Sequence, residues 1–380
     1  MNRRTIIRLL GGGVVVAATG AAWALTRDPE TARSPWFRAG EGSVDPRRRA
    51  LSYAILAPNP HNRQPWLADL SVPGEITLTC QLDRRLVHTD PYDRQITIGL
   101  GAFLELLAMA AAHDGFSVDV DLFPQGEPTP RLDERPIARI RFIEDGGTVP
   151  DPLFASVLRR RTNRNVHDLS RPVPPEAIRT IADAARASAI DHTTDPGRVA
   201  GLRDLTWRAM AVEMTTPAPW RESLDLTRIG KAEINADPDG ISLAGPMLEA
   251  LYSVGLIDKT ELMDPSSSAF RQQSEILKEP FDKTTAFLWL KTPGNTRADQ
   301  IAAGRDYVRI NLAATALGVA MQPLSQALQE FAEIAPLYAE MRAVLGVAPR
   351  QGLQMLTRIG YAQEPKPSPR WPYETRIRTA

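Results

Sequence analysis

Two segments of the 380-residue chain resemble each other, and this similarity constrains the fold more than any other feature. One begins at Arg94-Gln95-Ile96 and continues as an apolar helix toward Gly115, and the other begins at Asp299-Gln300-Ile301 and continues toward Gly318. The matching positions differ by 205. A repeat of this period predicts a duplicated domain and not a solenoid. Chance similarity of two Ala/Leu-rich helices is the alternative.

The rest of the body mixes helices with short strands whose apolar residues alternate. This mixture favours an α+β fold, with helices around antiparallel or mixed sheets. We expect a first half over 45–150 and a second half over 151–380, with an inserted lid at about 217–282. The predicted helices are 45–57, 96–113, 153–161, 174–187, 202–216, 297–318 and 327–345. The predicted strands are 66–72, 76–82, 118–123, 137–143, 285–291 and 353–362.

The N-terminus has the pattern of an export signal. Arg3 and Arg4 precede an apolar run that continues to Leu25, and no acidic residue occurs before Asp28. The pair of arginines predicts a twin-arginine signal over 1–25, recognised by the twin-arginine export machinery, followed by a linker over 26–44. The protein is then periplasmic or otherwise extracytoplasmic, and an uncleaved membrane anchor is the alternative. Because this route carries folded proteins, often with a cofactor bound, the signal also suggests a cofactor.

Composition excludes several functions. Lys and Arg total 45 and Asp and Glu total 45, so the formal net charge is zero and gives no electrostatic footprint for nucleic acid. A single cysteine excludes an internal disulfide framework. The five histidines are dispersed without metal-ligand spacing, so no metal site is expected.

Two motifs are the main candidates for a functional site. The loop 57–66 reads Ala-Pro-Asn-Pro-His-Asn-Arg-Gln-Pro-Trp, and the segment 160–164 reads Arg-Arg-Thr-Asn-Arg. Taken alone, the first could be simple turn chemistry and the second a solvated helix end. Together they resemble the Asn-x-Gln-Pro-Trp loop and the Arg-x-Ser-x-Arg/Lys motif of the nitroreductase family of FMN enzymes. The helix from Gly304 to Gly318 and the tail through Arg370 extend this resemblance over most of 45–375.

The order of the motifs differs from that of the family. Here the loop lies in the first half and the arginine motif in the second, whereas in the family the arginine motif comes first within one subunit. Family members are dimers with FMN at the subunit interface. The chain therefore resembles the Acg-type branch, and the resemblance implies a fused internal pseudo-dimer that acts as a monomer and retains one site.

The resemblance and the residue chemistry together assign roles around FMN. Its dianionic phosphate needs cations and hydroxyl donors, and the edge of its isoalloxazine ring needs groups that both donate and accept. The prolines hold the loop rigid, and a backbone donor is expected near flavin N5 in place of a catalytic side chain. The expected FMN-binding residues are Pro58, Asn59 (where the family usually has Ser), Asn62, Gln64, Arg160, Arg161, Thr162, Arg164, Leu324, Ser325 and Arg370.

Three functions agree with this site. The first is two-electron reduction of a nitroaromatic or quinone-like acceptor by hydride transfer through flavin N5, with NAD(P)H or another electron donor. The second is storage of FMN without turnover, with the insert as a lid. The third is a fold that has lost flavin.

Overall fold

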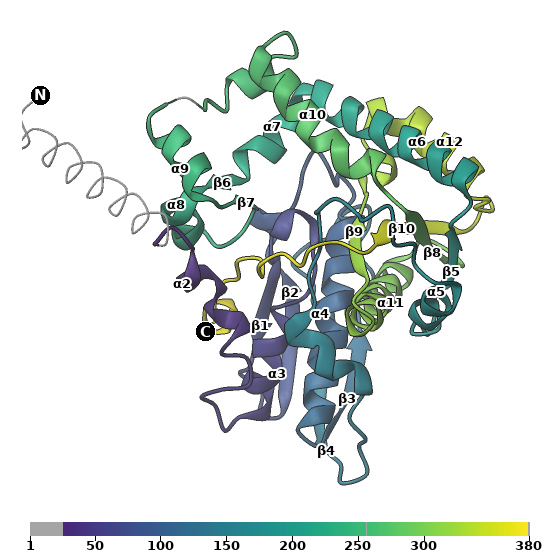
Figure 1. Ribbon diagram of the computed structural model, residues 1–380. Coiled ribbons are helices and arrows are strands. Elements are labelled where there is room, and N and C mark those ends of the chain that lie inside the picture. The colour runs from purple at the N-terminus through teal and green to yellow at the C-terminus, as the bar shows by residue number, and fades with distance from the viewer. Residues whose placement is uncertain (1–25, 256, 379–380) are drawn as a thin grey trace, which may run out of the picture.

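The computed structural model describes residues 26–255 and 257–378, so the predicted export signal lies outside the described residues. Two long helices, α4 (Arg94–His113) and α11 (Arg297–Ala316), lie side by side at the centre of the molecule (Figure 1). A four-stranded sheet flanks each of them. The fold is therefore α+β, as predicted.

The first sheet uses residues from the first half only. Its strands pair antiparallel in the order β1-β2-β4-β3. Helix α3 (Pro46–Ala54) precedes this sheet, and α4 connects its second strand to its third. The strands are β1 (Trp66–Asp69), β2 (Glu75–Cys80), β3 (Phe116–Leu122) and β4 (Ala138–Glu144).

The second sheet repeats the topology of the first. Its strands pair antiparallel in the order β5-β8-β10-β9, so by order of appearance both sheets read first, second, fourth, third. Helix α11 connects the second strand to the third, as α4 does in the first sheet. The fold is therefore duplicated, as predicted. The strands are β5 (Ala189–Thr193), β8 (Ala286–Thr292), β9 (Ala320–Pro323) and β10 (Gly352–Gly360).

The two central helices contact each other through glycine. A Cβ atom on Gly101 would lie 2.2 Å from the carbonyl oxygen of Ile301, and one on Gly304 would lie 1.9 Å from that of Ile98. These two contacts are related by symmetry. Gly304 is equivalent to Gly101 and Ile301 to Ile98, and each pair of equivalent residues is 203 positions apart. The offset of 205 inferred from sequence is therefore wrong by two residues. Ala and Leu matches are too frequent on both helices to fix the register.

Further elements complete the second half. The insert forms a subdomain that contains a two-stranded parallel sheet, β6–β7. The segments outside the insert are η4 (Pro152–Arg159), α5 (Pro175–Ala182), α6 (Pro196–Thr215), η6 (Gln326–Leu328), η7 (Ala332–Ile334) and α12 (Ala335–Val344). Those of the insert are α7 (Pro217–Asp225), β6 (Thr227–Ile229), α8 (Gly230–Ala236), β7 (Ile241–Leu243), α9 (Pro246–Ser253), η5 (Glu261–Met263) and α10 (Ser268–Asp282).

Some predicted elements differ from the structure. The helix predicted over 174–187 ends at Ala182, because the carboxylate of Asp306 accepts hydrogen bonds from the backbone N–H groups of Arg186, Ala187 and Ser188. The helix predicted over 327–345 is divided into η6, η7 and α12. The helix predicted over 153–161 is a 3-10 helix.

The prediction that residues 26–44 form only a linker is also wrong. It contains helices α2 (Glu30–Arg33) and η1 (Ser34–Trp36), and Trp36 is buried in the core of the first half. Figure 1 shows the C-terminal segment running from β10 back to α2, so the two ends of the described chain lie together.

One described helix, α4, is long and apolar enough to cross a membrane. Its most apolar window is 83% buried by the rest of the protein. Because α4 lies between a sheet and α11, its apolar character is that of a central core helix.

Candidate functional site

The loop over 57–66 has a strained backbone. His61, Asn62 and Gln64 have φ angles of 45°, 52° and 52°, which place three non-glycine residues in the left-handed region within four positions. The side chain of Asn59 closes the loop, since its Oδ1 accepts from the Gln64 backbone N–H at 2.7 Å and its Nδ2 donates to the Ala57 carbonyl at 3.1 Å. Such strain concentrates at functional sites and persists only where surrounding contacts enforce it.

The two loop amides that were expected to face an isoalloxazine ring bind the protein itself. Gln64 is fully buried; its Nε2 donates to the Pro238 carbonyl at 2.7 Å, and its Oε1 accepts from the Trp371 backbone N–H at 2.9 Å. The Asn62 Nδ2 donates to the Pro369 carbonyl at 3.0 Å, and its Oδ1 accepts from Arg370 at 2.5 Å. The structure therefore uses both amides to join the insert and the tail to the loop. Pro58 is buried beside them.

The arginine motif lies along the free edge of β9. The Asn163 backbone N–H donates to the Met321 carbonyl at 2.9 Å, and Arg358 donates to the carbonyl of Asn165 at 2.7 Å. Arg160 is buried, and it donates to the Leu56 carbonyl at 3.0 Å and to Asn311 Oδ1 at 3.1 Å. The motif from the second half is thus brought against the loop of the first half.

Arg370 was expected to be a phosphate ligand, yet its donors are all used within the protein. Its Nε donates to the Ile55 carbonyl at 2.9 Å, and its Nη2 to the carbonyls of Leu56 and Ala57 at 3.2 and 3.1 Å. Its Nη1 binds Asn62, Ser368 and Pro369. No N–H remains for an anion, so in this structure Arg370 contributes only its charge.

The other arginine-motif residues retain free donors. Arg160 and Arg161 each have a buried Nε with no hydrogen-bond partner. Within the described residues, no hydrogen bond or ion pair involves the side chain of Thr162 or of Arg164. Arg164 is exposed, although the protein atoms around its guanidinium still lower its pKa. Unpartnered donors of this kind are the groups that an anion would need, so the phosphate role of the motif stays a prediction.

His61 lies among charged groups from both halves. Burial lowers its pKa to about 4, Glu222 opposes this shift, and the positive charges of Arg164 and Arg63 add to it. The ring is therefore neutral at pH 7, and its buried Nδ1 has no partner. His61 is thus a loop residue with an unpartnered ring nitrogen.

The two residues of the predicted backbone donor, Leu324 and Ser325, directly follow strand β9. The Leu324 N–H donates to the Leu356 carbonyl at 2.8 Å, so Leu324 is not a free donor. Ser325 is half-buried at the start of η6, and its carbonyl accepts from the Leu328 N–H at 2.8 Å.

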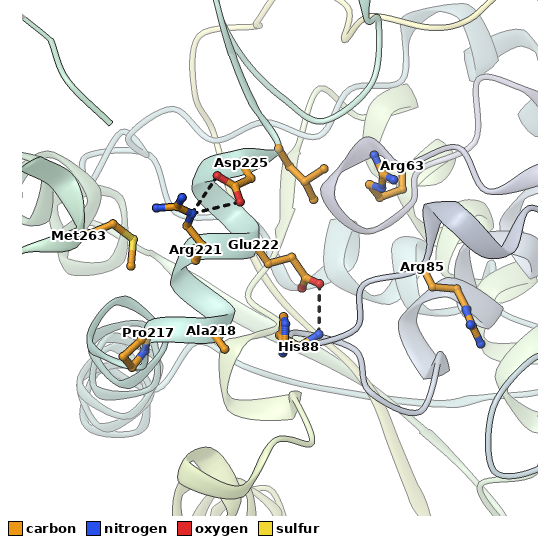
Figure 2. Close-up of a pocket in the computed structure, with 10 residues that line it drawn as sticks. Arg63, Arg85, His88, Pro217, Ala218, Arg221, Glu222, Asp225 and Met263 are labelled. Atoms are coloured by element: carbon orange, nitrogen blue, oxygen red, sulfur yellow. Dashed lines mark hydrogen bonds and ion pairs between the residues drawn. The ribbon is translucent and has the colours of Figure 1, made fainter. Parts of the chain in front are cut away.

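A pocket of about 620 Å³ lies between the loop and the insert. Figure 2 shows Glu222 of α7 directed toward His88, whose backbone N–H donates to it at 3.1 Å. None of the residues predicted from sequence lines this pocket, but Arg63, on the same loop as His61, does. The other lining residues are Arg85, Pro217, Ala218, Arg221, Asp225, Leu226 and Met263.

Two carboxylates of the insert also fix it to the first half. Glu222 accepts from the Thr89 backbone N–H at 2.9 Å and from its hydroxyl at 2.7 Å. Asp239 forms ion pairs with Arg63, Arg84 and Arg228, at 3.7 Å for Arg63 and 3.4 Å for Arg228. The insert therefore lies against the loop and its neighbouring residues.

Sequence reasoning missed Trp36, Asp239 and Trp371. The Trp371 backbone N–H and the Asp239 carboxylate hold the loop, and Trp36 contacts the arginines. One signal for Trp36 was available in the sequence. It is the aromatic pair Trp36-Phe37, which occurs in a segment otherwise expected to be a linker.

Comparison with known proteins points to the same family as the motifs. The chain is 28% identical over 336 residues to Rv3131 of Mycobacterium tuberculosis, named provisionally as an NAD(P)H nitroreductase, covering 83% of this chain and 85% of that protein. These relatives support the nitroreductase family. A second nitroreductase of the same species, also named provisionally, is Acg, which is 29% identical over 122 residues, or 32% of this chain and 36% of that one. No protein-family model matches the chain.

Solved nitroreductases also align with part of the chain. The FMN-dependent nitroreductase NfnB of Mycobacterium smegmatis, in complex with NADPH, is 24% identical and covers 58% of this chain and 95% of its own, with a TM-score of 0.36. A nitroreductase-like protein of Bacillus cereus is 14% identical and covers 61% of this chain and 98% of its own, with a TM-score of 0.35.

Proposed function

We propose that this nitroreductase-family chain binds FMN and reduces an electron-poor acceptor, such as a nitroaromatic or a quinone, with NAD(P)H or another electron donor. The observation that carries the proposal is the pair of unpartnered Nε–H groups of Arg160 and Arg161, on a motif held against the strained loop of the other half. When bound, FMN supplies the hydride chemistry. The protein supplies binding, orientation and exclusion of water.

The residues present fit the phosphate end of FMN better than its isoalloxazine ring. The free Nε–H groups of Arg160 and Arg161 and the Thr162 hydroxyl suit a dianionic phosphate. His61 and Arg164 are the groups left for the ring, because the Asn62 and Gln64 amides are engaged with the tail and the insert. Neutral His61 can donate a hydrogen bond or accept one.

The site also supports an internal pseudo-dimer that functions as a monomer. The loop belongs to the first sheet's half and the arginine motif to the second's, and the central glycine contacts relate the two halves by symmetry. One chain thereby supplies both components of a composite site. Size-exclusion chromatography with light scattering tests this, and an obligate dimer would contradict it.

Export by the twin-arginine route is part of the same proposal. Its support is the sequence of residues 1–25, in which Arg3 and Arg4 precede an apolar run. Replacing both arginines by lysine should leave the protein in the cytoplasm of the producing cell. Unchanged extracytoplasmic recovery of that variant would rule out this route.

FMN storage without turnover is the second candidate. It is favoured by the insert, which covers the loop through Glu222 and Asp239 and whose Pro238 carbonyl binds Gln64. A cover held by several contacts would suit retention more than turnover, because the release of bound molecules can depend on the opening of a lid.

The test begins with protein purified through its own export route. A flavin absorbance spectrum and FMN released by denaturation are expected, followed by NAD(P)H oxidation that depends on a nitroaromatic or quinone. Bound FMN without turnover would support storage, and no flavin binding would overturn both functions.

Variants then locate the site. Arg164→Ala should weaken FMN binding about tenfold or more, because a charge-assisted contact is lost. Arg179→Ala, on the exposed side of α5, is the matched control and should bind as the wild type does. Equal binding by both variants would refute the assignment of Arg164.

A further inference from the structure

The residues directly after the predicted signal form a strap over 26–37 that joins distant parts of the chain. The Ala32 carbonyl accepts from the Arg370 backbone N–H at 2.8 Å, and the Ala32 N–H donates to Asn235 Oδ1 at 3.1 Å. The Arg33 Nε donates to the Pro367 carbonyl at 2.9 Å. The strap is thereby fixed to both the C-terminal tail and the insert.

Trp36 of the strap lies among three arginines. The guanidinium carbons of Arg160, Arg161 and Arg370 lie 5.6, 4.8 and 5.4 Å from the centre of its ring. The indole Nε1 donates to the Ser368 carbonyl at 2.8 Å, which fixes the ring in place. Trp36 is only 2% exposed, so these contacts are desolvated and stronger than surface cation–π contacts.

The three charges lack the carboxylates that would ordinarily balance them. Within the described residues Arg160 and Arg370 form no ion pair, and the one pair of Arg161 joins it to an exposed Glu364 at 4.0 Å. Burial lowers the pKa of Arg160 to about 10, and the nearby Arg161 contributes to the shift. Repulsion among like charges in a buried site favours an anion there.

The indole and an anion would use different parts of a guanidinium. An aromatic ring contacts the flat face of the group, whereas its N–H bonds lie in the plane and donate at the edge. The buried Nε atoms of Arg160 and Arg161 are such edge donors, and neither has a partner. Contact with Trp36 therefore leaves the edges available to oxygen atoms of a phosphate.

We infer that Trp36 is a positioning residue of an anion site, whose indole holds Arg160 and Arg161 with their free Nε–H edges available to the phosphate of a flavin nucleotide. The inference rests on the proposed FMN binding, and it assigns a role to a segment outside both sequence motifs. The strap is then part of the cofactor site.

The test compares a ligand that has the phosphate with one that lacks it. Dissociation constants for FMN and riboflavin are measured for wild-type protein, Trp36→Leu and Trp36→Phe, after removal of bound flavin. Trp36→Leu should weaken FMN binding about ten- to a hundredfold while riboflavin binding stays nearly unchanged, because only the phosphate contacts are lost. Trp36→Phe should retain most of the preference for FMN.

Two further measurements separate this role from simple destabilisation. Trp289→Leu removes another buried indole, one with a single arginine at 5.7 Å, and should leave the ratio of FMN to riboflavin affinity unchanged. Inorganic phosphate should raise the melting temperature of the flavin-free wild type more than that of Trp36→Leu.

The outcomes distinguish the inference from the function on which it rests. If Trp36→Leu keeps the wild-type preference for FMN over riboflavin, Trp36 has no positioning role, while FMN binding stands. If the wild type binds neither FMN nor riboflavin, the proposed function fails and the inference fails with it.

Discussion

Gly304 faces the backbone carbonyl oxygen of Ile98 so closely that a Cβ atom would lie 1.9 Å from it. Gly304→Ala should therefore lower the free energy of unfolding by about 3 kcal/mol or more, because two packed helices must separate to accept one methyl group. Gly101→Ala should act similarly, since its Cβ would meet Ile301. Urea denaturation followed by circular dichroism measures both.

Gly201 provides the control for this pair. It lies within α6 with nothing within 4 Å of an added Cβ, so Gly201→Ala should stabilise the protein by about 0.5–1 kcal/mol through helix propensity. If Gly304→Ala also changed the free energy of unfolding by less than about 1 kcal/mol, the central helices would not be in such close contact at Gly304.

Arg370 holds the end of helix α3 by its guanidinium. Arg370→Lys should cost about 3 kcal/mol, because one ammonium cannot reach the carbonyls of Ile55, Leu56 and Ala57 together, and buried acceptors are left unpaired. Urea denaturation measures the loss. Arg378→Lys, at an exposed position, is the control, and equal stability of the two variants would contradict the role given to Arg370.

His61 makes stability depend on pH. Its folded-state pKa of about 4 lies below the ordinary 6.5, so between these values the unfolded chain binds more protons and stability falls as pH falls. Asn tolerates the left-handed backbone there and does not titrate. Between pH 7.5 and pH 5.5, the wild type should lose about 1.4 kcal/mol of unfolding free energy relative to His61→Asn. A constant difference would show that His61 is not buried as a neutral ring.

Glu222 fastens the insert to the first half. Glu222→Gln should accelerate hydrogen exchange at the Thr89 amide roughly tenfold, because an amide NH2 group replaces one acceptor oxygen and faces N–H donors. Exchange followed by mass spectrometry measures this. Glu279→Gln, which alters an exposed pair with Lys283 on α10, should leave Thr89 unaffected. Wild-type exchange in Glu222→Gln would mean that α7 is held by other contacts.

Local patterns predicted most of the elements. Strands β1 to β4 and the helices α4 and α11 follow from alternation and helical periodicity, which depend on residues near each other in sequence. Their exact ends did not follow. The early end of α5 depends on Asp306, more than a hundred residues away, and no local signal announces that contact.

The functional motifs were partly predictable for the same reason. The sequence identifies Arg160 to Arg164 as a dense group of donors, and the structure leaves several of them unpaired. It could not show that Gln64 and Arg370 would be saturated by carbonyls of the insert, the tail and α3, since those partners come from distant segments.

The sequence by itself determined the α+β class, the duplication and the two motifs, because each is written in residue type and spacing. The tertiary structure decided the register between the two halves, since only close contact at Gly101 and Gly304 distinguishes an offset of 203 from one of 205. It also decided the place of Trp36. A tryptophan in a polar segment gains its position among three arginines only when the two ends of the described chain meet.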